Sequence, residues 1–250
     1  RGLVGSEMCI RDSINLLRCA WAGSQKYGAL VWSGDIKSSF PSMKNQVAAG
    51  LNMGIAGIPW WTTDIGGFFG ANINDPEFHE LLVRWFEYGC FCPVMRLHGY
   101  RWPLQPQYGT TGGATCVSGA PNEVWSYTDQ VCEILSDYLR LRERMLPYIT
   151  ELMEEAHEKG TPVMRPLFYD FPEDKESWNV ETEYMFGPKV LVKPITDADA
   201  RETDVYLPGG ASWTNAWTGE TFEGGQKVHV AAPIEQIPLF TRDGYKLPMK

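Results

Sequence analysis

The most informative segment of the chain reads Gly28-Ala29-Leu30-Val31-Trp32-Ser33-Gly34-Asp35. An apolar run that meets a Ser-Gly turn predicts a short buried strand with a carboxylate at its end. The pattern recurs downstream, where the apolar run 55–61 leads into Thr62-Thr63-Asp64. Between the two, Pro41 suits the first turn of a helix over roughly 41–53, with Ser38 or Ser39 as its cap. The unit is therefore strand, acid, helix, strand, acid.

This repeated unit predicts an α/β fold with parallel strands. In a parallel sheet or barrel, the carboxyl ends of the strands share one face, and that face carries the chemistry. A third strand over 91–97 would bring Arg96 and His98 there. Alternatively, each Asp caps the helix that follows it. We favour a site, because both carboxylates stand beside tryptophan and glycine, and we expect the strand ends at Asp35, Asp64 and His98 to converge on one open face.

The whole chain divides into three segments. Residues 1–13 fit nothing that follows and read like a translated sequencing adapter, so we expect them to be non-native. Residues 14–160 carry the strand–helix units, a helix that starts at Asp75-Pro76-Glu77, and a long helical region broken at Pro147. From 161 to 250 the pattern changes to short strand-like runs bounded by Pro, Gly, Asp or Asn, which predicts an antiparallel β domain. These runs cover 166–169, 189–194, 202–207, 213–217 and 228–231.

Composition excludes several function classes. The net charge is −9, and no cluster of Lys and Arg predicts a nucleic-acid surface. No apolar run approaches the roughly 18 residues that a membrane span needs. Six cysteines without paired spacing, and histidines without ligand spacing, give no reason to expect a metal or another cofactor. The ten tryptophans include several beside aspartates, as in sugar-binding clefts, where an indole packs on a pyranose ring.

Several motifs, in the same order, resemble glycoside hydrolase family 31, which includes α-glucosidases and α-xylosidases. They start with Arg18, Trp32-Ser33-Gly34-Asp35, Trp61-Thr62-Thr63-Asp64-Ile65-Gly66-Gly67-Phe68 and Arg96-Leu97-His98-Gly99. They continue with Met185-Phe186-Gly187-Pro188, Val205-Tyr206-Leu207-Pro208, Trp217-Thr218-Gly219-Glu220 and Ile237-Pro238-Leu239-Phe240. The resemblance covers residues 14 to 250. It implies the C-terminal part of a (β/α)8 TIM barrel over 14–160, followed by the proximal C-terminal β-sandwich domain over 161–250.

The resemblance also implies a reaction. It is the retaining hydrolysis of terminal non-reducing α-linked xylose or glucose from an oligosaccharide substrate, through a covalent glycosyl-enzyme intermediate. Asp35 matches the general acid/base. The residues matching the sugar subsite are Arg18, Asp64, Arg96 and His98, with Trp32 and Phe68 as its aromatic wall. The nucleophilic aspartate of the family lies on an earlier barrel strand without a counterpart in residues 1–250, so we expect this chain alone to be inactive.

Alternatives stay open at this point. Asp64 could support the site rather than touch substrate, Arg96 could form a structural ion pair, and His98 could be a structural histidine. The chain could also be a carbohydrate-binding or scaffold module without chemistry. Within the enzyme class, the segments 75–99 and 118–125 look more like α-xylosidase-type members than starch-directed ones. A homo-oligomer is neither indicated nor excluded.

Overall fold

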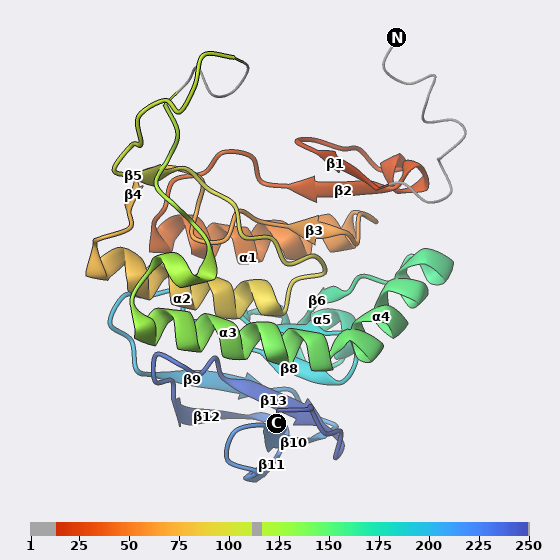
Figure 1. Cartoon of the computed structure of the whole chain (residues 1–250). Helices are drawn as coiled ribbons and strands as arrows, with labels where there is room; N and C mark the ends of the chain where they lie inside the picture. The colour runs from red at the N-terminus through yellow and green to blue at the C-terminus, as the bar shows by residue number, and fades with distance from the viewer. Residues whose placement is uncertain (1–13, 112–116, 250) are drawn as a thin grey trace.

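The computed structural model describes residues 14–111 and 117–249, and these form three layers (Figure 1). At the top lies a parallel sheet of order β1-β2-β3, made of β1 (Asn15–Leu17), β2 (Ala29–Trp32) and β3 (Trp61–Thr62). Helices occupy the middle layer, and antiparallel strands the bottom one. The adapter-like segment 1–13 lies outside the described residues. Among those residues, none of the helices has the length and hydropathy that crossing a bilayer requires.

Two helices follow the strands of the parallel sheet. Ser39 caps α1 (Phe40–Ile55) by accepting from the Ser42 amide at 3.3 Å. Asp75 caps α2 (Pro76–Cys90) by accepting from the Glu77 amide at 3.0 Å. Both caps were expected from sequence. Because neither helix is capped by Asp35 or Asp64, the capping alternative for these two carboxylates is wrong.

The predicted long helical region is built from separate helices. It begins with a 3-10 turn, η3 (Val124–Ser126), and continues as α3 (Asp129–Arg144) and α4 (Leu146–Lys159). The break at Met145 places Pro147 in the first turn of α4, where its missing N–H costs no hydrogen bond. Gly160 ends α4 in the left-handed region, with φ of 71°.

The bottom layer is a β-sandwich. Its larger sheet has the order β11-β10-β13-β8-β7-β6, and its smaller one pairs β12 with β9. The larger sheet contains β6 (Met164–Pro166), β7 (Tyr184–Phe186), β8 (Val190–Val192), β10 (Ser212–Asn215), β11 (Thr221–Glu223) and β13 (Leu239–Arg242); the smaller contains β9 (Glu202–Leu207) and β12 (Gln226–Ala231). The short helical segments are η1 (Ser24–Tyr27), α5 (Leu167–Asp170) and η4 (Lys175–Trp178), and β4 (Ala71–Asn72) pairs in parallel with β5 (Arg101–Trp102).

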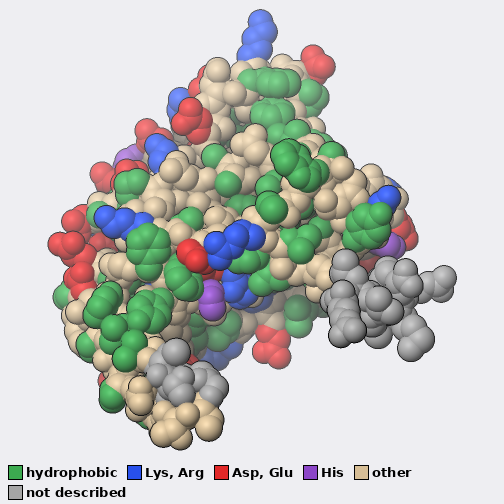
Figure 2. Space-filling view, turned by 90° about the horizontal axis from the view of Figure 1, so that it is seen from above, with side chains coloured by type: hydrophobic (Ala, Val, Ile, Leu, Met, Phe, Trp, Pro, Cys, Tyr) green, Lys and Arg blue, Asp and Glu red, His purple; other side chains and the backbone are tan. Residues whose placement is uncertain are grey.

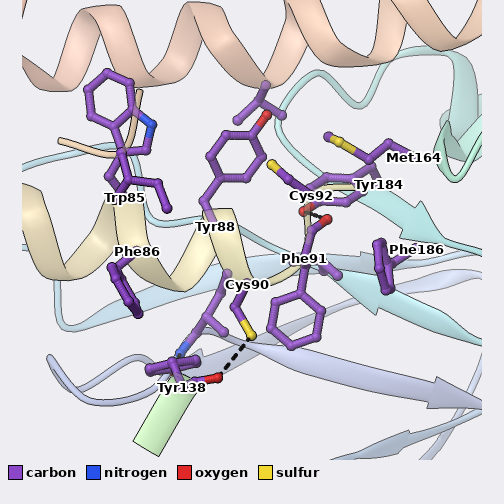
Figure 3. Packing of buried hydrophobic residues seen from close by; sticks show 14 of the residues in the cluster. Trp85, Phe86, Tyr88, Cys90, Phe91, Cys92, Tyr138, Met164, Tyr184 and Phe186 are labelled. Carbon is purple, nitrogen blue, oxygen red and sulfur yellow. Dashed lines mark hydrogen bonds between the residues drawn. The ribbon is translucent and has the colours of Figure 1, made fainter. Parts of the chain in front are cut away.

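Strands β7 and β8 of the six-stranded sheet are buried on both faces. In β7, Tyr184 and Phe186 join the core shared with the helices, whereas Met185 joins the core between the two sheets. This follows from the period of two in a strand. Figure 3 shows the shared core, where Tyr184 from β7 meets residues of α2 and its C-terminal end. The Tyr184 hydroxyl donates to the Phe91 carbonyl at 2.9 Å.

Three expectations about strands were wrong. Residues 91–97 run beside β3 without forming a strand, because Pro93 lacks an N–H and Arg142 takes the carbonyls of Cys90, Cys92 and Pro93, each at 2.7 Å. The strand placed over 55–61 is limited to Trp61–Thr62, since Ile55 still belongs to α1. Of the strand placed over 166–169, Pro166 ends β6 and the rest forms α5.

Candidate active site

An accessible carboxylate follows β2. Parallel pairing of β1 with β2 sets Leu17 opposite Val31, so the two strands end side by side. Gly34, at φ of 78°, turns the chain after β2 and leaves the Asp35 side chain 42% exposed. Arg18, which follows β1, donates from Nη2 to both Asp35 carboxylate oxygens at 3.1 Å. Asp35 is therefore fixed in direction while it still faces solvent.

A second carboxylate follows β3 in the opposite environment. Asp64 is fully buried, and one of its oxygens accepts from Arg96. Burial raises the pKa of Asp64 above its ordinary value, and the charges of Arg96 and His98 oppose that rise. Its Oδ2 atom has no hydrogen-bond partner among residues 14–111 and 117–249. A buried carboxylate oxygen without a donor is suited to receive one from a ligand.

Aromatic side chains connect these groups. The Trp32 ring lies 5.4 Å from the Arg18 guanidinium carbon and 5.9 Å from that of Arg96. The Phe68 ring lies 5.6 Å from the His98 ring, centroid to centroid. Figure 2 looks onto this face of the molecule, where acidic, basic and histidine side chains gather among hydrophobic ones.

The structure thus brings the seven candidate residues to the carboxyl ends of the parallel strands: Arg18, Trp32, Asp35, Asp64, Phe68, Arg96 and His98. Arg18 and Arg96 both lie near Trp32; Arg18 pairs with Asp35 and Arg96 with Asp64, while Phe68 contacts His98.

The loops after the two carboxylates hold each other. The Phe68 amide donates to the Ile36 carbonyl at 2.7 Å, and the Ser38 amide donates to the Phe69 carbonyl at 2.8 Å. Gly67 makes this approach feasible. Its φ is 75°, and a Cβ there would lie 2.6 Å from the Ser38 Cα. Glycine at this position is therefore required by the close contact of the two loops.

One buried residue below the site carried no signal in the sequence. Arg101 is inaccessible to solvent, and its guanidinium donates to backbone carbonyls of the loop after Asp64. A lone arginine that follows Gly99-Tyr100 belongs to no pattern that spacing could detect.

The described residues contain no group of three or more His, Cys, Asp or Glu side chains arranged to hold a metal ion. A cavity of about 640 Å³ lies elsewhere, between α3 and the segment that ends the chain, with Ile134, Tyr138 and Trp217 in its lining. None of the seven candidate residues contributes to it. The chemistry that the site itself can support is therefore that of an exposed carboxylate for proton transfer, a buried carboxylate and cations for polar contacts, and aromatic rings for the face of a ligand.

Fold and site together define part of a (β/α)8 barrel, with carboxylates at its strand ends, followed by a β-sandwich. The chain matches the model of the glycosyl hydrolases family 31 TIM-barrel domain over residues 10–152 and that of the glycosyl hydrolase family 31 C-terminal domain over residues 160–247. The chain belongs to glycosyl hydrolase family 31.

Individual relatives agree with this assignment. An alpha-xylosidase from Saccharolobus solfataricus is 39% identical over 94% of this chain and 30% of its own length. Alpha-glucosidase 2 from Bacillus thermoamyloliquefaciens is 35% identical over 92% of this chain and 26% of its own. The crystal structure of a GH31 alpha-xylosidase from a soil metagenome, complexed with xylose, is 53% identical, with a TM-score of 0.91 over 96% of this chain and 36% of that one. The chain thus spans about a third or less of the length of these proteins.

Proposed function

We propose that this chain supplies the C-terminal part of the catalytic barrel, residues 14–160, and the following β-sandwich, residues 161–250, of a retaining α-glycosidase. The substrate is an oligosaccharide with terminal, non-reducing α-linked xylose or glucose. Similarity supports either sugar, because the soil-metagenome alpha-xylosidase is 53% identical to this chain and an uncharacterized family 31 glucosidase is 72% identical over 37% of it. The whole enzyme could also assemble as a homo-oligomer.

The observation that carries this proposal is the contrast between the two carboxylates. Asp35 is 42% exposed and Asp64 is fully buried, although both follow neighbouring parallel strands. Retaining glycosidases need a carboxyl group that exchanges a proton with the leaving oxygen and then with water, which requires access. We assign this acid/base role to Asp35. Asp64, with Arg96, is assigned to polar contacts with the sugar.

In this mechanism, a nucleophilic aspartate on another barrel strand bonds to the anomeric carbon while the glycosidic bond breaks. Asp35 gives its proton to the departing oxygen. Asp35, now ionised, takes a proton from water as that water attacks the anomeric carbon and releases the nucleophile. Arg18 holds the Asp35 carboxylate in one direction for both steps, and Trp32 and Phe68 pack on the ring. We assign no residue of this chain as the nucleophile, so the chain alone should not hydrolyse aryl α-glycosides.

The test uses a chimera in which residues 14–250 of this chain replace the matching segment of the soil-metagenome alpha-xylosidase. Asp35→Ala should slow substrates with poor leaving groups by roughly 10²–10⁴-fold, the range for general acid–base catalysis. Substrates with very good leaving groups need no protonation, so their first step should survive. Azide needs no general base and should restore turnover with retained configuration. Asp137→Ala is the control, because Asp137 is 66% exposed on α3 and pairs with the equally exposed Arg140.

Two results would overturn the proposal. If Asp35→Ala lowers the rates of all substrates equally and azide has no effect, Asp35 is not the acid/base. If the unsubstituted chimera folds and binds oligosaccharide but does not hydrolyse it, the chain is a carbohydrate-binding or scaffold module instead.

A further inference from the structure

Arg101 is a buried cation that binds backbone rather than a carboxylate. Its Nη1 atom donates to the Gly67 carbonyl at 2.8 Å and, less closely, to that of Phe68 at 3.4 Å. Its Nη2 atom donates to the Ile65 carbonyl at 3.1 Å. These carbonyls belong to residues 65–68, the turn that follows Asp64. In the part of the chain that the structure describes, no carboxylate forms an ion pair with Arg101.

The remaining side of the guanidinium joins a different segment. Its Nε atom donates to Asn122 Oδ1 at 3.2 Å, and the Tyr127 hydroxyl donates to the same oxygen at 2.5 Å. The Arg101 carbonyl accepts from the Ala120 amide at 2.8 Å. The Phe78 ring of α2 lies 4.9 Å from its guanidinium carbon. Arg101 is therefore held by Asn122 and Phe78 as well as by the turn after Asp64, so its planar guanidinium is fixed before any ligand binds.

Arg101 also ties the two polar segments of the site together. The Tyr100 amide, next to it in the chain, donates to the Phe68 carbonyl at 2.5 Å. A Cβ on Gly99 would lie 2.4 Å from Arg101 Nη1, so the segment after His98 is packed directly on the guanidinium. The guanidinium therefore lies between the segment that carries Phe68 and the segment that follows His98.

We propose that Arg101 is a positioning residue that sets the separation of Phe68, His98 and the turn after Asp64, and thereby the fit of the sugar ring. It acts through backbone carbonyls, that of Phe68 among them, and not through the side chains of the seven-residue face. This inference rests on the proposed function of the site for its ligand, but its geometric part concerns the chain by itself. Methionine at 101 keeps the length and removes every donor. Lysine keeps the charge but cannot reproduce the planar fork.

The first arm of the test uses the full 250-residue chain. Hydrogen exchange followed by NMR compares Arg101→Met with Arg144→Met, whose arginine also donates to backbone carbonyls, at Pro248 and Met249, but far from the site. We expect the Gly67 and Tyr100 amides to exchange roughly tenfold faster or more in Arg101→Met, the factor for one lost hydrogen bond of about 1.4 kcal/mol. Ring-to-ring contacts between Phe68 and His98 should weaken. Arg144→Met should leave the exchange rates and the ring contacts unchanged. The exchange rates of Arg101→Lys should lie between those of the unsubstituted chain and Arg101→Met, so the lysine variant decides the test if the methionine variant does not fold.

The second arm measures kinetics in the chimera. A substitution that merely lowers the folded fraction reduces apparent kcat and leaves KM unchanged, whereas mispositioned sugar contacts raise KM. We expect Arg101→Met to raise KM and Arg101→Lys to restore part of it. Unchanged KM, or unchanged exchange of Gly67 and Tyr100 in both variants, would overturn the proposal. An inactive unsubstituted chimera would instead count against the proposed function, while the exchange measurements in the chain would still decide the geometric role of Arg101.

Discussion

Replacing Arg84 by methionine removes a guanidinium that joins α2 to the β-sandwich. Arg84 is fully buried and pairs with Glu87 one helical turn away, at 3.2 Å. It also donates to the carbonyls of Pro233 at 3.0 Å, Gln236 at 3.4 Å, Ala200 at 3.0 Å and Ala232 at 2.7 Å. The substitution therefore breaks a buried ion pair and leaves four carbonyls without this donor.

The size of the effect follows from these contacts. Breaking a buried pair from one side costs about 3–5 kcal/mol, mostly from the charge left behind. Here burial raises the pKa of Glu87 to about 8, against the lowering effect of Arg84. With that pKa, Glu87 is already mostly protonated at neutral pH, so the loss of Arg84 there leaves buried carbonyls without their donor rather than an unpaired charge. We expect Arg84→Met to lower the free energy of unfolding by roughly 3–4 kcal/mol at neutral pH, about 1 kcal/mol for each carbonyl that loses its donor.

A second variant separates the ion pair from the carbonyl contacts. Arg84→Met combined with Glu87→Leu removes both charges, and such replacements of buried pairs are often neutral or stabilising. In this chain the four carbonyls and the Tyr138 hydroxyl, which donates to Glu87 at 3.0 Å, would still lose partners. We therefore expect the double variant to retain a loss of about 2–3 kcal/mol.

Urea unfolding of the full chain, followed by tryptophan fluorescence, measures these values. Arg140→Met is the matched control, because the Arg140–Asp137 pair is about two-thirds exposed on both sides, and its loss should cost less than about 1 kcal/mol. If the double variant is as stable as the unsubstituted chain, Arg84 acts as an ion-pair partner and not as an anchor for the sandwich carbonyls.

Other predictions use the same unfolding measurement. Burial raises the pKa of Glu87 from 4.5 to about 8, so the folded chain binds this proton more tightly than the unfolded chain does. The protonated carboxyl therefore stabilises the fold fully below pH 4.5, and this stabilisation is lost as the pH rises through 8. Glu87→Gln should flatten this decline, and parallel pH curves for the two chains would contradict it. Gly67→Ala should destabilise by more than the 1–2 kcal/mol typical of a left-handed alanine, because its Cβ also meets the Ser38 backbone. Gly210→Ala, at φ of 82° with open space around it, should show only the conformational cost, and equal losses for the two would refute the steric argument.

The local sequence pattern was sufficient to predict part of this fold. The strand before Asp35, both helix caps and the change to short strands after residue 160 are set by neighbouring residues, which is the information that periodicity and capping rules use. The strand expected over 91–97 failed because Arg142, some fifty residues away, takes its carbonyls. β7, β11 and β13 were not expected from sequence; β7 is buried on both faces and so lacks an alternating pattern.

The candidate site divides in the same way. Asp35 and Asp64 follow apolar runs, so their place at the strand ends could be expected. The pairing of Arg18 with Asp35, and the clamp that Arg101 forms on residues 65–68, depend on parallel neighbours and on loops that meet only in the folded chain. The spacing of residues along the chain does not predict such contacts.

The six-stranded sheet that faces two cores limits how this gene region can be rearranged. Alternate residues of β7 and β8 complete the hydrophobic interior of the helical part, and their neighbours complete that of the sandwich. A recombination breakpoint between α4 and β6 would leave both daughter pieces with half of a buried layer facing water. Recombination between related genes is therefore expected to keep the barrel helices and this sheet together. Crossovers should be tolerated instead in the outer strand pair β9–β12 or in surface loops.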